Sequence, residues 1–204
     1  MNSDPFVFVV EDDPSVRHAL RLLLKSAGIA SAAYGSAEEF LASHAPHHPS
    51  CIVVDVRMPG MSGLELHKAL IDKGVDTPVI IMTGHGDIAM AVDALKAGAA
   101  DFIEKPCDDD VLLSAIREAI AKDEQKAGQM AELSELRRRL GLLTEREREV
   151  MDLVVAGHLN KVVASRLGIS DRTVEVHKAR IMQKMAARSA SELIRMSLVL
   201  ELAQ

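Results

Sequence analysis

Residues 51–63 read CIVVDVRMPGMSG, and this stretch decides the fold. Four apolar residues, three of them β-branched, precede Asp55, and Pro59, Gly60 and Gly63 follow it. A β-branched run bounded by turn residues favours a buried parallel strand over a short helix. We therefore expect Asp55 at the carboxyl end of a strand, where open α/β sheets bind their ligands. The alternative is an acid that only caps the loop.

Similar apolar runs alternate with segments of helical spacing in the first half of the chain. Five strands alternating with five helices over about 120 residues predict a doubly wound α/β domain with right-handed crossovers. Ser36 and Glu39 have the spacing of a capping box. The other strands are expected at Pro5–Val10, Ile29–Tyr34, Pro78–Met82 and Ala100–Glu104. The helices are expected from Pro14 to before Gly28, after Ser36, over Gly63–Gly74 and Ile88–Ala97, and from Asp108 or Asp109.

Composition and charge limit the classes of protein to consider. Hydrophobic residues make up 48% of the 204 residues, enough for a packed core, which must be aliphatic because Trp is absent and Phe and Tyr total five. Residues 1–122 carry a net charge of −8, which excludes general nucleic-acid binding there, whereas residues 141–204 carry +2. Cys51 and Cys107 lack metal-ligand spacing, and the run Phe6–Val10 is too short to span a membrane. We expect a cytoplasmic protein with no membrane partner.

Polar side chains follow four of the predicted strands. Glu11, Asp12 and Asp13 follow the first, Asp55 the third, Thr83 the fourth and Lys105 the fifth. If these strands are neighbours, the side chains share one edge of the sheet, and carboxylates gathered there need a cation such as Mg²⁺, which prefers oxygen ligands. A carboxylate beside a divalent cation, a lysine and a threonine is equipped to attack phosphorus and form an aspartyl phosphate.

These residues resemble the receiver domain of bacterial response regulators. The resemblance covers residues 5–122 and is carried by Asp12-Asp13, Asp55 with Met58-Pro59-Gly60 and Gly63, Thr83, and Lys105-Pro106. It implies a flavodoxin-like sheet of five parallel strands in the order 2-1-3-4-5. It also implies that Asp55 accepts a phosphoryl group from the phosphohistidine of a histidine kinase.

The same resemblance implies roles for the surrounding residues. Mg²⁺ would be held by Asp12, Asp13, Asp55 and the backbone carbonyl of Arg57. Thr83 and Lys105 would contact the phosphoryl group, and the Lys105–Pro106 bond would be cis. Phe102 stands at the position of the family's switch aromatic residue, although as a strand residue it can also simply pack on the fourth helix.

The segment after the receiver-like region is predicted to be an extended helix. Residues 114–140 contain no proline, and Met130, Leu133, Leu136 and Leu140 recur at three- and four-residue spacing. One narrow apolar stripe indicates a helix with a seam. Residues 123–140 are therefore expected to form a helical linker, which either packs on a neighbouring domain or forms a dimer stalk.

Residues 141–204 are helical by pattern throughout. Thr144 and Glu147 form a capping-box pattern before the first helix, and Gly157 ends it. Asn160–Leu167, a turn at Gly168–Ser170 and a longer helix to Met185 together predict a helix-turn-helix, and Ser189–Leu202 is a fourth helix. We expect a small all-α domain of four helices.

The helix that ends at Met185 has two different faces. Val174, Ile181 and Met185 are expected to be buried. A stripe of small residues flanked by basic side chains suits the major groove of DNA. The basic side chains would contact phosphates, and Glu175 would accept a hydrogen bond from a cytosine amino group. An ordinary solvated helix in a small bundle is the alternative. The outward residues are Arg172, Glu175, Val176, Lys178, Ala179 and Arg180.

This region resembles the LuxR-type DNA-binding domain. The resemblance covers residues 141–202 and rests on Leu143–Glu147, Gly157-x-x-Asn160-Lys161, Ala164, Leu167–Ser170 and Thr173-Val174-x-Val176-His177. A receiver joined to such a domain resembles the NarL/FixJ family. The resemblance adds Asn160, Lys161 and Thr173 to the expected DNA contacts.

The two resemblances together imply a phosphorylation-switched transcription factor. We expect a receiver at 1–122, a linker at 123–140 and a DNA-binding domain at 141–204. The expected partners are a sensor histidine kinase, promoter DNA, RNA polymerase and, on phosphorylation, a second copy of the chain, and the expected targets are nitrogen-fixation or low-oxygen genes. We expect the chain to catalyse no reaction other than its own phosphorylation and dephosphorylation.

Two alternatives remain. One is a helix-turn-helix regulator that works without phosphate. The other is an aspartyl-phosphate hydrolase, which Arg57 disfavours because such enzymes carry a second acid at this position.

Overall fold

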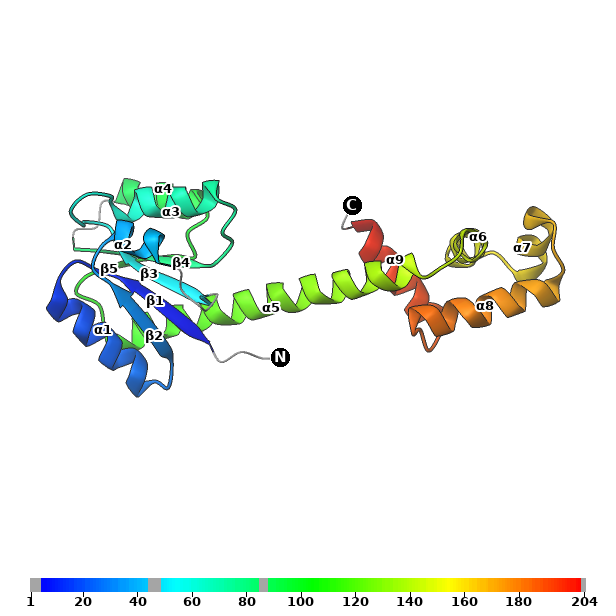
Figure 1. Ribbon diagram of the computed structural model, residues 1–204, viewed down its shortest axis with the longest axis horizontal. Helices are drawn as coiled ribbons and strands as arrows, with labels where there is room; N and C mark the ends of the chain where they lie inside the picture. Colours follow the sequence, from blue (N-terminus) through cyan, green and yellow to red (C-terminus); the bar gives the residue numbers. More distant parts are fainter. Residues whose placement is uncertain (1–4, 44–48, 85–87, 203–204) are drawn as a thin grey trace. The chain divides into compact units, whose positions relative to one another are not determined.

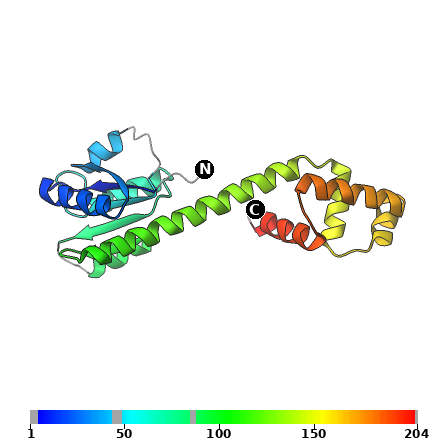
Figure 2. The same ribbon diagram turned by 90° about the horizontal axis from the view of Figure 1, so that it is seen from below.

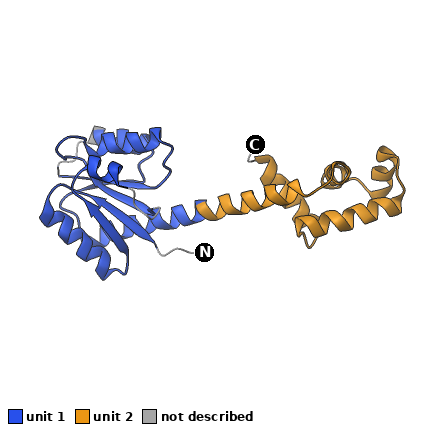
Figure 3. Cartoon of the chain, in the orientation of Figure 1, with its two compact units in different colours: residues 1–126 blue, residues 127–204 orange. Residues whose placement is uncertain are grey.

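The computed structural model describes residues 5–43, 49–84 and 88–202. The chain divides into two compact units, Met1–Lys126 and Ala127–Gln204 (Figure 3). Among the described residues, no helix is both long enough and apolar enough to cross a membrane.

The first unit is built on a sheet of five parallel strands (Figure 1). The strand order is β2-β1-β3-β4-β5, which confirms the expected order. Every residue of β3 and β4 is buried, as expected of strands covered on both faces. The strands are β1 (Phe6–Val10), β2 (Ala30–Tyr34), β3 (Cys51–Asp55), β4 (Val79–Thr83) and β5 (Asp101–Glu104).

Helices cover both faces of this sheet and enclose two aliphatic cores. One core packs Leu24 of α1 and Ile116 of α5 against alternate strand residues such as Val9 and Val53. The other packs Phe40 of α2 and Leu66 of α3 against the opposite strand residues. The helices are α1 (Pro14–Ser26), α2 (Ala37–Ala42), α3 (Gly63–Asp72), α4 (Ile88–Lys96) and α5 (Asp109–Gly141).

Helix caps explain several of these boundaries. The expected cap at Ser36 is half formed, because Ser36 accepts from the Glu39 amide at 3.1 Å while the Glu39 carboxylate accepts from the Gly35 amide at 2.6 Å. At α3, Ser62 and Glu65 form a complete capping box, which was not among the predicted caps. The loop after Asp55 thus passes directly into a well-capped helix.

The helix α5 continues without a break from Asp109 to Gly141, as Figure 2 shows. This agrees with the helical linker predicted for residues 123–140. Within the second unit, Leu136 is 5% exposed and belongs to the core of that unit, with Leu133 and Leu140 packed beside it. The apolar seam of the linker is therefore used, at its end, for packing on the helical domain.

Within its described residues, the second unit contains four further helices around one core. Val174, Ile181 and Met185 are buried in it, as predicted. Gly168 ends α7 in the left-handed conformation, with φ at 65°, and Ser170 caps α8, so the two helices form the expected helix-turn-helix. Both halves of the capping box predicted at Thr144 are present. The helices are α6 (Glu145–Val155), α7 (Asn160–Leu167), α8 (Asp171–Met185) and α9 (Ala190–Leu202).

Candidate functional site

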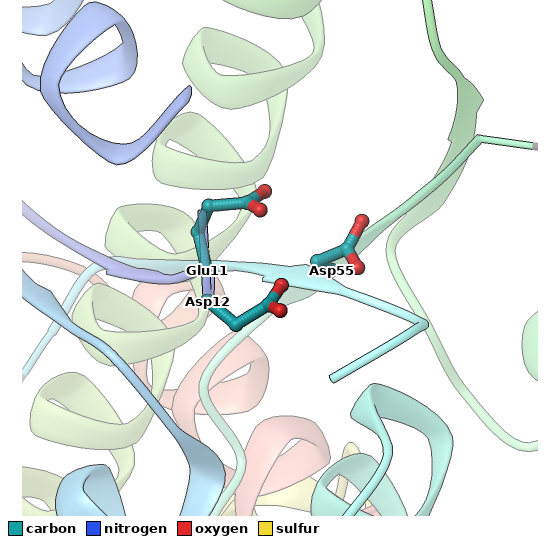
Figure 4. Close-up of side chains that lie close together, drawn as sticks. All are labelled: Glu11, Asp12 and Asp55. Carbon is teal, nitrogen blue, oxygen red and sulfur yellow. The ribbon is translucent and has the colours of Figure 1, made fainter. Parts of the chain in front are cut away.

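Three carboxylates meet where β1 and β3 end. Oxygen atoms of Glu11, Asp12 and Asp55 all lie within 4.8 Å of one another (Figure 4). The parallel register, which pairs Val10 with Val54, places the next residue of each strand side by side. Glu11 is 3% exposed and Asp55 7%, whereas Asp12 is half-buried. Two of the three acids are thus largely withdrawn from water.

Lys105 bridges the two buried acids. Its Nζ lies 2.6 Å from Glu11 Oε2 and 2.6 Å from Asp55 Oδ1. Burial lowers the pKa of Lys105, but its hydrogen bonds and attraction to Asp55 and Glu11 more than offset this, so the pKa is raised overall. For Glu11, burial outweighs the lysine and raises the pKa of the carboxyl. The Lys105–Pro106 bond is cis, which confirms the expectation.

Asp13 lies outside this cluster. Its Oδ1 accepts from the backbone amides of Ser15, at 2.7 Å, and Val16, at 3.2 Å, and so caps α1. The acidic pair beside Asp55 is therefore Glu11–Asp12 and not Asp12–Asp13. The proximity of Glu11 to Asp55 could have been predicted from the sequence. Glu11 directly follows β1 and Asp55 ends β3, and the parallel pairing of these strands brings their ends together.

The loop after Asp55 is held close to the carboxylate. The amide of Arg57 donates to Asp55 Oδ2 at 2.9 Å, and the Arg57 side chain is exposed. Gly63, at the start of α3, packs so tightly that a Cβ there would lie 2.2 Å from the Asp55 carbonyl oxygen. Only glycine permits this close approach of the two backbone segments. Sterics therefore explain why glycine stands at position 63, where a turn residue was predicted.

Thr83 and Phe102 lie on the neighbouring strands, Thr83 at the end of β4 and Phe102 within β5. Thr83 ends β4, is 1% exposed, and pairs in register with Glu104. Its carbonyl accepts from the Lys105 amide at 2.6 Å, which links the two strand ends. Phe102 on β5 is half-buried against the core that contains residues of α3 and α4. Residues 85–87, which connect β4 to α4, lie outside the described residues.

The donor set of the cluster fits Mg²⁺. Three carboxylates offer oxygen ligands alone, the type that this hard cation prefers. If all three are ionised, the single ammonium of Lys105 leaves negative charge uncompensated among these four side chains. A divalent cation beside Asp12 and Asp55 would neutralise it.

The second unit presents most of the predicted DNA contacts on its surface. Val176 is 45% exposed on α8. The half-buried members of the set are Asn160, Thr173 and Lys178. The exposed members are Lys161 on α7 and Arg172, Glu175, Val176, Ala179 and Arg180 on α8.

Two of these predicted contacts are bonded to each other. The Nζ of Lys178 donates to Oδ1 of Asn160 at 3.0 Å, which joins α8 to the start of α7. The Thr173 hydroxyl lies 2.8 Å from the Ser170 hydroxyl at the cap of α8. These side chains therefore also support the geometry of the helix-turn-helix itself.

Comparison with known families covers both units. Residues 7–117 match the response regulator receiver domain, and residues 141–197 match the bacterial regulatory proteins of the luxR family. The chain belongs to the two-component response regulators that combine a receiver with a LuxR-type DNA-binding domain. A receiver implies a histidine kinase partner, and a LuxR-type domain implies DNA binding.

Individual members of this class are similar to the chain over most of its length. The chain is 48% identical to the transcriptional regulatory protein FixJ of Azorhizobium caulinodans over 193 residues, which cover 95% of the chain and 92% of that protein. It is 44% identical to Nodulation protein W of Bradyrhizobium diazoefficiens, over 94% of the chain and 84% of that protein. These relatives confirm the expected likeness to the NarL/FixJ family, and the first of them is a transcriptional regulator by name.

Solved structures agree with this assignment. The response regulator StyR has a TM-score of 0.84 and 40% identity, with 96% of this chain and 98% of that chain covered. Full-length FixJ from B. japonicum has a TM-score of 0.62 and 40% identity, with 98% and 99% covered.

Proposed function

We propose that phosphorylation of Asp55 switches this response regulator into its DNA-binding form. The observation that carries the proposal is the Lys105 ammonium, 2.6 Å from both Glu11 and Asp55, two acids whose oxygens lie within 4.8 Å of an oxygen of Asp12. A strand-end carboxylate with an ammonium and two further acids is equipped for phosphoryl transfer rather than for loop capping. We take the donor to be the phosphohistidine of a sensor histidine kinase.

In the proposed reaction, a carboxylate oxygen of Asp55 attacks phosphorus and the histidine nitrogen leaves. Asp12, Asp55 and the Arg57 carbonyl would hold Mg²⁺, which neutralises charge on the transferring oxygens when bound. We leave Asp13 out of this set because its carboxylate caps α1. Lys105 would pair with a phosphoryl oxygen, and the Thr83 hydroxyl would donate to another.

The new phosphoryl group adds about −1.5 to −2 charges at Asp55. We propose that attraction of Thr83 toward it reshapes the following loop and lets Phe102 turn inward, which changes the surface of α4 and β5. That surface would then pair with a second copy. Two α8 helices in a dimer would read half-sites about one helical turn or more apart.

We propose that the dimer activates transcription together with RNA polymerase. We propose nitrogen-fixation or low-oxygen genes as its targets, in keeping with the likeness to FixJ and to Nodulation protein W. The DNA contacts would come from the nine predicted residues of α7 and α8. The domain boundaries we propose are 1–122, 123–140 and 141–204, and the site of action is the cytoplasm, where the DNA lies.

DNA-shift titration and sizing of the full chain, with and without a small phosphodonor and Mg²⁺, test this proposal. We expect phosphodonor to produce a dimer and tighter promoter binding, and Asp55→Asn to abolish both responses. Asp72→Asn, which changes an exposed aspartate of α3, outside the α4 and β5 surface proposed to pair, is the matched control. Promoter affinity that ignores phosphodonor would support a phosphate-independent regulator, and steady turnover of a phosphate ester would support a hydrolase.

A further inference from the structure

Arg17 reaches back from α1 to the end of β1. Its Nη1 donates to the carbonyl of Glu11 at 2.6 Å and to the carbonyl of Asp12 at 3.1 Å. The side chain is half-buried, and a Cβ on Gly35 would lie 3.8 Å from the same nitrogen. The guanidinium is therefore enclosed between the β2–α2 turn and the acidic loop.

These two bonds act on the backbone around Asp12. The Glu11 carbonyl belongs to the peptide plane before Asp12, and the Asp12 carbonyl belongs to the plane after it. Because peptide units are planar, fixing both planes fixes φ and ψ of Asp12. These angles set the direction in which its side chain leaves the loop.

The three acids differ in how their side chains are held. Lys105 holds the carboxylates of Glu11 and Asp55 directly. Within the described part of the chain, no hydrogen bond or ion pair holds the carboxylate of Asp12. Its aim at Asp55 therefore depends on the backbone that Arg17 fixes.

We propose that Arg17 is a positioning residue that sets the Mg²⁺ affinity of the receiver. It keeps the Asp12 carboxylate beside Asp55 before the ion arrives, so binding does not have to order the loop. The inference rests on the proposed Mg²⁺ site and deepens it. Partners that orient metal ligands in this way change affinity by about 10- to 100-fold when they are removed.

Mg²⁺ titration of the full chain by calorimetry, well below the unfolding temperature, tests the inference. Arg17→Met keeps the length of the side chain but removes its donors, and we expect the Kd for Mg²⁺ to rise about tenfold. Arg17→Lys keeps the charge but not the fork of donors, and we expect an intermediate Kd. Arg21→Met, one turn later on the exposed face of α1, should leave the Kd unchanged.

A second readout separates positioning from folding. Circular dichroism without Mg²⁺ should show a folded Arg17→Met protein, whereas the rise in unfolding temperature at a fixed Mg²⁺ concentration should shrink, because less ion is bound. A folded Arg17→Met protein with the wild-type Kd overturns the inference. If Arg17→Met does not fold, a wild-type Kd in Arg17→Lys overturns it. Absence of Mg²⁺ binding in the unaltered chain would refute the proposed site and the inference with it.

Discussion

Gly63 and Gly128 show how differently two glycines of one chain can act. At Gly63, a Cβ would meet the backbone oxygen of Asp55 at 2.2 Å, and backbone cannot move aside without displacing the site. At Gly128, in the middle of α5, a Cβ would meet nothing within 4 Å. The first glycine is required by packing, and the second only weakens a helix.

We therefore expect opposite effects of alanine at the two positions. Gly63→Ala should lower the free energy of unfolding by about 1–3 kcal/mol, as other overpacked sites do. Gly128→Ala should raise it by about 0.5–1 kcal/mol, the difference in helix propensity. Urea unfolding followed by circular dichroism measures both. Equal, small effects would show that the loop after Asp55 can shift without cost.

At this scale the sequence brought Asp55, Thr83 and Lys105 to strand ends, as the structure does, but it named Asp13 where the structure has Glu11 beside Asp55. Asp55, Thr83 and Lys105 follow strands of clear pattern, so their common edge could be predicted from alternation alone. Which of Glu11 and Asp13 lies beside Asp55 could not be predicted in this way, because three successive acids follow β1. It was decided by the cap of α1, since the Asp13 carboxylate is taken by the amides of Ser15 and Val16.

At the scale of elements, an ion pair joins the start of α6 to the end of α8. The Glu147 carboxylate is 2% exposed and accepts from Lys184 Nζ at 2.6 Å and from the Thr144 amide at 2.9 Å. The hydrogen bond from Lys184, with that from Thr144, lowers the pKa of Glu147 from 4.5 to about 2. The sequence predicted the capping box but not the lysine, which lies 37 residues away.

This lowered pKa predicts a pH dependence of stability. A carboxyl whose pKa is lower in the folded state contributes stability above its unfolded value, and this contribution is lost as the pH falls from about 4.5 to about 2. Glu147→Gln should therefore destabilise the chain at pH 7, by about 1–3 kcal/mol for a charged hydrogen bond. The difference from the unaltered chain should shrink toward pH 2. Unfolding curves over this range measure it, and a constant difference would contradict the assignment.

The bond between Lys178 and Asn160 bears on how α7 and α8 meet DNA. Because the Asn160 oxygen already accepts from Lys178 at 3.0 Å, its amide nitrogen is the end that can donate to a phosphate. Lys178 would then act through Asn160, whereas the exposed Arg172 would act on phosphate itself. Sequence spacing placed both residues on the same surface but could not distinguish these two roles.

The salt dependence of DNA binding distinguishes them. Arg172→Met should reduce the slope of log K against log salt by about one, because one phosphate contact is lost. Lys178→Met should weaken binding by roughly 2- to 10-fold, the effect of one hydrogen bond, with a smaller change in slope. Gel-shift titrations over a range of salt concentrations measure both quantities. A slope reduced by a full unit in Lys178→Met would place its ammonium directly on phosphate.

At the scale of the whole molecule, the question is where the DNA-binding unit begins. The resemblance to the LuxR-type domain starts at residue 141. The apolar stripe of residues 130–140 alone could not decide whether the preceding helix packs on a domain as a tether or forms a dimer stalk. The structure adds Leu136 to the core of this unit, and Arg139 Nη1 donates to the Met185 carbonyl at 3.0 Å, where α8 ends. The end of α5 is thus a structural part of the second unit. The sequence could not predict this, because the contacts that show it join residues far apart in the chain.

Two truncations to alanine on α5 test this boundary. Leu136 is 5% exposed, so Leu136→Ala should lower the free energy of unfolding of the second unit by about 2–4 kcal/mol, the usual cost of a core cavity. Met130 is 59% exposed on the same helix, so Met130→Ala should change it by no more than about 0.5 kcal/mol. Urea unfolding of the full chain, followed by circular dichroism, compares the two variants. If both are neutral, residues 127–140 form a linker that contributes nothing to the stability of the DNA-binding unit, whereas a loss confined to Leu136→Ala means that a stable fragment has to begin before residue 136.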